Sequence, residues 1–208
     1  MRPEHLAFAV LMAAWGVLGA MLVHARIRAR RGDDGAAADG ATRRRDLASW
    51  GGLVLQGVGF ALAFGGKRPQ GFPLLPGIAT PALDWAFALL VMLLAVASTA
   101  FAGWALRTLD KQWSLTARVR ADHALVTHGP FAHVRHPIYT ALLGLLVATG
   151  LALADVRALL LAVVVYLIGT LWRADREERL LRGMFGAAYD AYAARVPRLV
   201  PSLRPRAP

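Results

Sequence analysis

Long apolar runs without charged residues constrain the fold of this chain more than any other feature. Five such runs occur, at residues 6–23, 47–66, 85–106, 138–153 and 158–172. About 20 apolar residues form a helix that spans the hydrocarbon core of a bilayer, and the last two runs are somewhat shorter than that. The sequence therefore predicts an all-α integral membrane protein with about five transmembrane helices, the last two paired as a short hairpin around residues 154–157.

The charge and cysteine content exclude several kinds of function. The chain has no cysteine, which rules out disulfides, zinc sites built on thiolates and thiol nucleophiles. Its net charge of +11 comes almost wholly from arginine, and the arginines gather in short segments beside the apolar runs. This distribution is typical of the cytoplasmic side of a membrane protein, so membrane lipids rather than nucleic acid are the expected partners.

The position of the arginines also predicts the orientation. Residues 26–46, residues 107–135 and the tail after residue 173 hold most of the arginine, whereas the loops at 67–81 and 154–157 hold little. By the positive-inside rule, the N-terminus lies outside and the C-terminus lies in the cytoplasm. Residues 32–41 and the Pro/Gly-rich residues 67–81 are predicted to be loops. An Arg/Ala-rich composition with only two lysines indicates a bacterial protein, for which the expected location is the inner membrane.

The pattern at residues 173–195 predicts an amphipathic cytoplasmic helix. Its apolar face carries Leu180, Leu181, Met184, Phe185, Ala188, Tyr189 and Tyr192. Its solvated face carries Asp175, Arg176 and Arg179. Arg173 and Glu177 share the apolar face and are expected to point into protein, and Glu178 lies at the border. The alternative is a helix that lies on the lipid surface with an exposed run of charges.

His136 and Pro137 predict the start of the fourth apolar helix, because proline favours the first turn. The free N–H groups of that turn form an anion site, to which Arg135 and His136 add donors, and Tyr139 sits in the same turn. The alternative is an interfacial belt of Tyr, Arg and His side chains. We do not expect a metal site, because the spacings of His128, His133 and His136 are not a strong ligand pattern.

Together, these segments resemble the isoprenylcysteine carboxyl methyltransferase family over about residues 112–201. The resemblance rests on residues 123–126, the turn at 129–131, the Arg135-His-Pro-Ile-Tyr139 motif, Arg173 with Glu177 and Glu178, and residues 185–197. Members of this family are integral membrane enzymes that use S-adenosylmethionine. The related phospholipid methyltransferases share the His-Pro and Glu-Glu elements.

The resemblance implies a site for S-adenosylmethionine and its product S-adenosylhomocysteine. With Arg135 from the helix-start argument, the expected cofactor-binding residues are His123, Ala124, Leu125, Val126, Phe131, Arg135, His136, Pro137, Ile138, Tyr139 and Glu177. The expected catalytic residues are Arg173, which would bind the substrate carboxylate, Glu177, which would bind the cofactor's ammonium group, and Glu178. Two residues depart from the family: Phe131 stands where Tyr is usual, and Ala141 stands where Gly is usual.

The expected function is therefore carboxyl O-methylation of a lipophilic, isoprenylcysteine-like acid, which is either a small molecule or a lipidated protein. Residues 1–208 would form a single membrane domain, with three N-terminal spans in 1–106 and the cofactor-binding catalytic half in 107–208. One alternative is methylation of a phospholipid amine or another small lipophilic acceptor, with Glu178 or a histidine as base. The other is a non-catalytic transport or assembly protein. The oligomeric state stays open.

Overall fold

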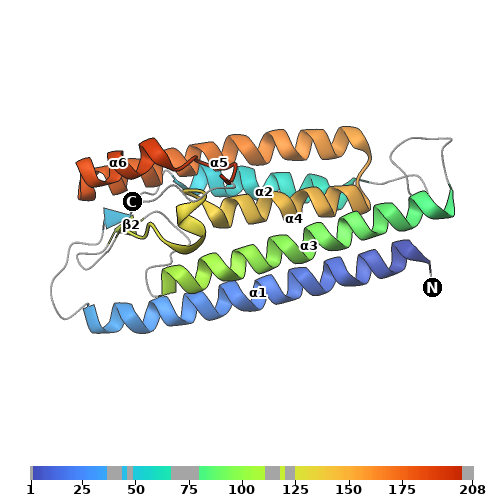
Figure 1. Cartoon of the computed structure of the whole chain (residues 1–208), viewed down its shortest axis with the longest axis horizontal. Coiled ribbons are helices and arrows are strands. Elements are labelled where there is room, and N and C mark those ends of the chain that lie inside the picture. Colours follow the sequence, from blue (N-terminus) through green and yellow to red (C-terminus); the bar gives the residue numbers. More distant parts are fainter. Residues whose placement is uncertain are drawn as a thin grey trace.

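The computed structural model describes residues 2–36, 44–45, 49–66, 80–110, 118–119 and 125–202. Its helices are α1 (Pro3–Ala36), α2 (Ser49–Gly65), α3 (Pro81–Leu109), the 3-10 helix η3 (Gly129–Ala132), α4 (Pro137–Leu153), α5 (Val156–Phe185) and α6 (Ala187–Arg195). Two-residue strands, β1 (Arg44–Arg45) and β2 (Arg118–Val119), pair antiparallel. The predicted all-α fold is thus confirmed, and all five apolar runs are helical (Figure 1).

The helices have the dimensions and surface of a membrane protein. In the described part of the chain, α1, α3 and α5 are long and apolar enough to cross a bilayer, and α2 and α4 are shorter apolar helices. Large aliphatic side chains such as Val54, Leu93 and Leu160 are exposed on the outside of the bundle. Side chains of this kind are unfavourable in water but suit a surface that faces lipid. The chain is an integral membrane protein.

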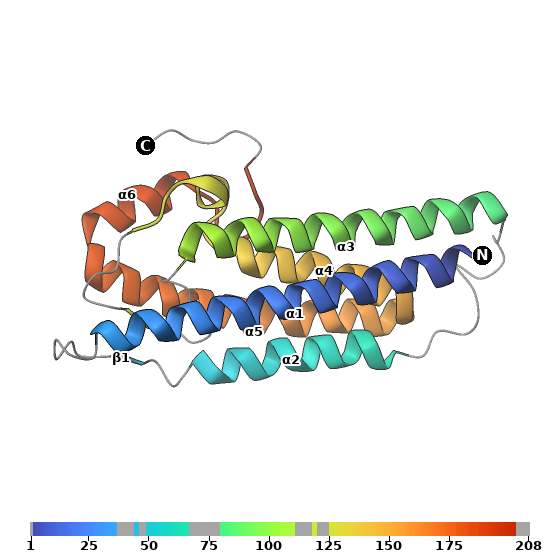
Figure 2. The same ribbon diagram turned by 90° about the horizontal axis from the view of Figure 1, so that it is seen from below.

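The helices run along the long axis of the bundle, and α5 is the partner of α2. α2 packs mainly against α5, whereas α3 packs against both α1 and α4 (Figures 1 and 2). The start of α1 and the short helix α6 lie at opposite ends of the bundle in both views. An odd number of spans requires this arrangement. The end that carries α6 also carries β1, β2 and the start of α4, and its cytoplasmic location stays a prediction.

Two helix boundaries differ from the predictions. α1 continues to Ala36, so residues 32–36 are helical rather than part of a loop, and residues 37–41 lie outside the described part. Residues 32–36 are Gly-Asp-Asp-Gly-Ala and have low helix propensity, but adding a residue to an existing helix costs much less than starting a new one. α5 runs without a break from its apolar part to Phe185, so no separate helix begins at Arg173. Gly186, with φ +51°, ends α5 and starts α6.

The turns at both ends of α4 follow from local sequence. α4 begins at Pro137, as predicted, with His136 as the residue before the first turn. The predicted hairpin is closed by Asp155, whose carboxylate accepts hydrogen bonds from the backbone N–H groups of Arg157 and Ala158. α3 begins at Pro81, the last residue of the predicted loop 67–81, and residues 67–79 lie outside the described part. These boundaries place the His-Pro motif beside the last turns of α5.

Candidate active site

The segment before α4 is held in place by the last described residues of the chain. The backbone N–H of Arg135 donates to the carbonyl of Pro197 (2.9 Å), and that of His136 donates to Arg198 (3.2 Å). In return, the N–H of Ser202 donates to the carbonyl of His133 (2.9 Å). This pairing could not be predicted from the sequence, because residues 196–202 have neither strand nor helix periodicity. It fixes where the His136 side chain lies relative to α5.

His136 lies between the two adjacent glutamates of α5. Its Nε2 is 3.0 Å from Oε1 of Glu178, and its Nδ1 is 3.5 Å from Oε2 of Glu177. Burial lowers the pKa of His136, but the hydrogen bonds and charges of both carboxylates outweigh that effect and raise its pKa. An imidazolium has an N–H on each ring nitrogen and can serve both carboxylates at once. The geometry therefore favours the protonated ring.

Glu178 is the more buried of the two glutamates, although its predicted position was at the border of the apolar face. Its side chain is 4% exposed, against 24% for Glu177. Arg198 donates to both of its carboxylate oxygens, at 2.9 and 2.6 Å, and Arg135 lies 3.4 Å away. With His136, three cationic or protonatable side chains surround this carboxylate. Such contacts suit a residue that holds the site together rather than one that exchanges protons.

Glu177, Tyr139 and Arg173 form the second part of the site. The hydroxyl of Tyr139 donates to Oε1 of Glu177, and the ring of Tyr139 stacks on that of His136. The guanidinium of Arg173 lies 5.1 Å from the Tyr139 ring centre, and its Nη2 is 3.9 Å from Oε1 of Glu177. Arg173 is only 5% exposed. The alternative of an exposed charge run on the lipid surface is therefore wrong, whereas Asp175 and Arg179 do pair at the surface.

Gln56 of α2 belongs to this network, and the sequence analysis did not assign it to the site. Nη1 of Arg173 donates to Oε1 of Gln56 (2.8 Å), and Nε2 of Gln56 donates to the hydroxyl of Thr170 (2.8 Å). The only signal in the sequence is a single amide side chain in an otherwise apolar run. Its partner is 117 residues away, so hydropathy alone could not connect the two.

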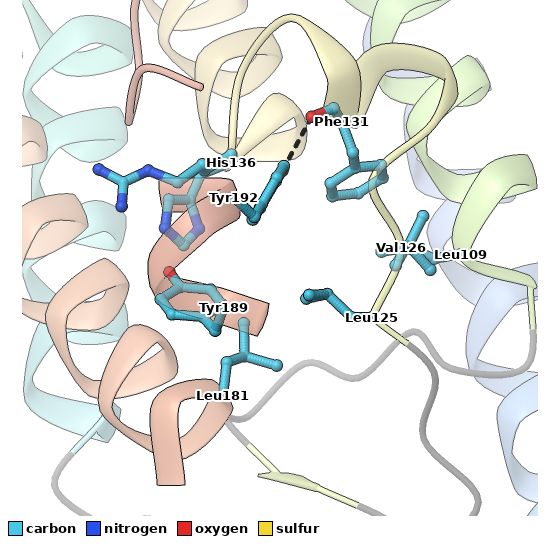
Figure 3. A pocket seen from close by; sticks show the side chains of 9 residues that line it. Leu109, Leu125, Val126, Phe131, His136, Leu181, Tyr189 and Tyr192 are labelled. Atoms are coloured by element: carbon cyan, nitrogen blue, oxygen red, sulfur yellow. Dashed lines mark hydrogen bonds between the residues drawn. The ribbon is translucent and has the colours of Figure 1, made fainter. Parts of the chain in front are cut away.

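A pocket opens beside His136. Its lining residues are Leu109, Leu125, Val126, Phe131, Arg135, His136, Leu181, Tyr189 and Tyr192 (Figure 3). The hydroxyl of Tyr192 donates to the carbonyl of Phe131 (2.8 Å), which ties α6 to the turn before α4. Burial raises the pKa of Tyr189 to about 12, so its hydroxyl stays protonated. The pocket has aliphatic and aromatic walls, with Arg135 and His136 as its charged groups.

The expected cofactor residues lie in different parts of the structure. Leu125, Val126, Phe131, Arg135 and His136 line the pocket. Tyr139 and Glu177 lie next to His136 in the adjoining network, and Pro137 is buried at the start of α4. Ile138 instead packs with Ala25 and Leu106 of α1 and α3. His123 and Ala124 lie outside the described residues. Their expected contacts with a cofactor stay predictions.

Two other histidines and the two departures from the family pattern complete the predicted features. Nδ1 of His133 bonds the carbonyl of Ser202 (2.9 Å), and His128 is exposed. In the described residues, no three His, Cys, Asp or Glu side chains gather closely enough to hold a metal ion. Of the two departures from the family pattern, Phe131 lines the pocket and Ala141 is buried in the core with Leu145 and Ala148.

Comparison with known proteins matches the part of the chain that carries His136, Tyr139, Arg173, Glu177 and Glu178. Residues 89–183 match the model of the isoprenylcysteine carboxyl methyltransferase (ICMT) family. The protein-S-isoprenylcysteine O-methyltransferase B of Arabidopsis thaliana is 36% identical over 105 residues, 47% of this chain and 50% of that protein. The protein-S-isoprenylcysteine O-methyltransferase of Schizosaccharomyces pombe is 36% identical over 81 residues, 38% of this chain and 34% of that protein. The chain thus spans about half the length of the first relative, and the expected family resemblance is confirmed.

Proposed function

We propose that this chain, a member of the ICMT family over residues 89–183, is a membrane methyltransferase that converts the carboxylate of a lipophilic acid into its methyl ester. One observation carries the proposal. A buried arginine, Arg173, lies among apolar helices next to a carboxylate, Glu177, that is itself bonded to Tyr139 and close to His136. Such a costly arrangement of charges inside a membrane protein is typical of a functional site.

The chemistry of the site fits S-adenosylmethionine as the methyl donor. The aliphatic and aromatic walls of the pocket suit a flat adenine ring, and Arg135 and His136 supply positive charge for the carboxylate of an amino-acid group. Glu177 is 24% exposed and can accept from an ammonium group. When bound, S-adenosylmethionine supplies an electrophilic methyl group.

Arg173 would hold the acceptor. A guanidinium binds a carboxylate through two parallel hydrogen bonds, which fixes the direction of the attacking oxygen. The carboxyl group of the acceptor, with an ordinary pKa near 4, is ionised at neutral pH and loses no proton in the reaction. With the donor bound, transfer would form an oxygen–carbon bond and break a sulfur–carbon bond, so the positive charge of the donor and the negative charge of the acceptor would cancel. The apolar helices around Arg173 exclude water, so positioning supplies most of the rate enhancement.

The same contacts argue against an amine as the acceptor. An amine must lose a proton, which requires a base near the reacting atoms. Glu178 is surrounded by Arg198, Arg135 and His136, and the raised pKa of His136 favours its protonated form, which cannot accept a proton. Within the described part of the site, the carboxylate acceptor is therefore the better match.

The acceptor class follows from the names of the relatives together with the apolar bundle. Both relatives are called protein-S-isoprenylcysteine O-methyltransferases, and an isoprenyl chain is an apolar group that dissolves in a bilayer. We infer an isoprenylcysteine-like acid, free or attached to a protein, whose tail enters from the membrane. The donor would enter from the cytoplasm, at the arginine-rich end of a bacterial inner-membrane protein.

The test is methyl transfer from tritiated S-adenosylmethionine to N-acetyl-S-farnesylcysteine by the protein purified in detergent. The expected product loses its label as methanol in mild alkali, because a methyl ester is alkali-labile. Arg173→Lys should reduce the transfer at least about tenfold, because a single ammonium cannot replace the two-bond guanidinium contact. Alkali-stable label would indicate methylation of an amine and contradict the proposal. Transfer by Arg173→Lys at the wild-type rate would exclude the assigned carboxylate contact.

A further inference from the structure

We propose that Gln56 is a positioning residue that orients the guanidinium of Arg173 without cancelling its positive charge. The inference rests on the proposed function, because it assumes that Arg173 binds the acceptor carboxylate. It adds α2 to the reaction centre, although α2 lies outside residues 89–183, the part that matches the family.

The hydrogen bonds of Gln56 give the amide a single useful orientation. Its Nε2 donates to the Thr170 hydroxyl (2.8 Å), and this bond leaves its Oε1 to accept from Nη1 of Arg173 (2.8 Å). Thr170 lies three residues before Arg173 on α5, so both partners lie on one face of that helix. Gln56 is 4% exposed, and Thr170 is fully buried. A buried amide with both ends bonded is rigid, and it transfers that rigidity to Arg173.

The packing of α2 on α5 fixes the stem of Arg173 as well. A Cβ atom at Gly52 would lie 2.5 Å from Cγ of Arg173 and 2.6 Å from the carbonyl oxygen of Gly169. A Cβ at Gly169 would lie 2.6 Å from the carbonyl oxygen of Gly52. The two glycines therefore let the helix backbones approach closely, as small residues commonly do in membrane proteins. The stem of Arg173 passes against Gly52, and its head reaches Gln56 one turn further along α2.

A neutral amide at this position has a different consequence from a carboxylate. A glutamate 2.8 Å from the guanidinium would form a buried ion pair and would repel the carboxylate of an acceptor. An apolar side chain would leave a guanidinium N–H without its acceptor in a site from which water is excluded. Glutamine satisfies the donor and adds no negative charge that would compete with the carboxylate of the acceptor.

The test compares Gln56→Glu and Gln56→Met with the wild type and with Thr149→Val. The hydroxyl of Thr149 accepts a partly buried hydrogen bond from Trp15 of α1 (3.1 Å), so Thr149→Val removes a comparable bond between helices that does not involve Arg173. For each protein, calorimetry in detergent gives the dissociation constants of N-acetyl-S-farnesylcysteine and of its methyl ester. S-Adenosylhomocysteine binding and the thermal midpoint report whether the variant is folded, and steady-state kinetics separate KM from kcat.

The wild type is expected to prefer the acid over the ester. Gln56→Glu should remain folded, should still bind S-adenosylhomocysteine, and should reduce the preference for the acid at least about tenfold. Gln56→Met should lower kcat, because Arg173 loses its orientation, and Thr149→Val should keep the wild-type preference and kcat. If Gln56 had only a structural role, Gln56→Glu would keep the wild-type preference for the acid, because a new ion pair with Arg173 would still hold α2 and α5 together.

Two results would overturn the assignment. One is a folded Gln56→Glu protein that keeps the wild-type preference for the acid, and the other is a wild type that does not prefer the acid at all. A wild type that prefers the acid but transfers no methyl group would contradict the proposed function alone, because the binding comparison does not depend on turnover.

Discussion

The imidazole of His136 bridges two adjacent carboxylates, with Nε2 3.0 Å from Glu178 and Nδ1 3.5 Å from Glu177. Both contacts require a ring that carries two protons. The bridge therefore connects the protonation of one side chain to the relative positions of α4 and α5. It also separates two tasks, since Glu178 faces Arg198 and Arg135 while Glu177 faces Tyr139 and Arg173.

The raised pKa of His136 predicts a pH-dependent stability. A group whose pKa is raised in the folded state contributes stability that is fully present below its unfolded pKa, near 6.5, and is lost as the pH rises through the folded pKa. The wild type should therefore have a higher thermal midpoint than His136→Gln, and the difference should be larger at about pH 6 than at about pH 9. Differential scanning fluorimetry in detergent measures this difference. A difference that is constant over the same range would mean that folding does not raise the pKa of His136.

Arg198 should stabilise the site through Glu178. Arg198→Ala removes two hydrogen bonds to a carboxylate that is 4% exposed, and we expect the free energy of unfolding to fall by about 1–2 kcal/mol. The matched control is Arg179→Ala, which breaks the exposed pair with Asp175 and should cost about 0–1 kcal/mol. Denaturant unfolding in mixed micelles compares the two. Equal losses would show that the Arg198 contact is no more than a surface ion pair.

The close approach of α2 and α5 predicts contrasting effects of two glycine substitutions in α2. Gly52→Ala places a methyl group against Arg173 and the backbone of Gly169, so it should destabilise the protein by about 1–3 kcal/mol and reduce methyl transfer. Gly57→Ala meets no atom within 4 Å and should be neutral or stabilising by up to about 1 kcal/mol, since alanine favours helix more than glycine does. Thermal midpoints and turnover test both changes. A tolerated alanine at residue 52 would contradict the packing described for Arg173.

Much of the fold could be predicted from the sequence, because local physical rules decide it. The apolar runs predict the spans, and the His136-Pro137 pair predicts the start of α4 at the observed residue. Asp155 closes the hairpin through a local cap. The continuation of α1 to Ala36 was missed because a Gly/Asp-rich segment resembles a loop, whereas the helix already formed can extend through it.

The site was only partly predictable, since its main contacts join residues that are far apart in the sequence. The grouping of His136, Tyr139, Arg173 and Glu177 followed from the family resemblance that motifs on two helices carry. Gln56 could not be connected to it, because an apolar run does not reveal which of its faces meets protein and which meets lipid. Arg198 lies in a C-terminal segment without helix or strand periodicity, so its contact with Glu178 could not be predicted either. The burial of Glu178 was underestimated because the residues that surround it come from that segment and from the loop before α4.

The most direct test of the account is the binding of S-adenosylhomocysteine to the detergent-purified protein, measured by calorimetry for the wild type, Glu177→Gln and the surface control Asp175→Asn. We predict that the wild type and Asp175→Asn bind alike and that Glu177→Gln binds at least about tenfold more weakly, because it loses a charged hydrogen bond to the ligand's ammonium group. A folded wild-type protein that does not bind, or equal affinity in all three proteins, would contradict the proposed cofactor site.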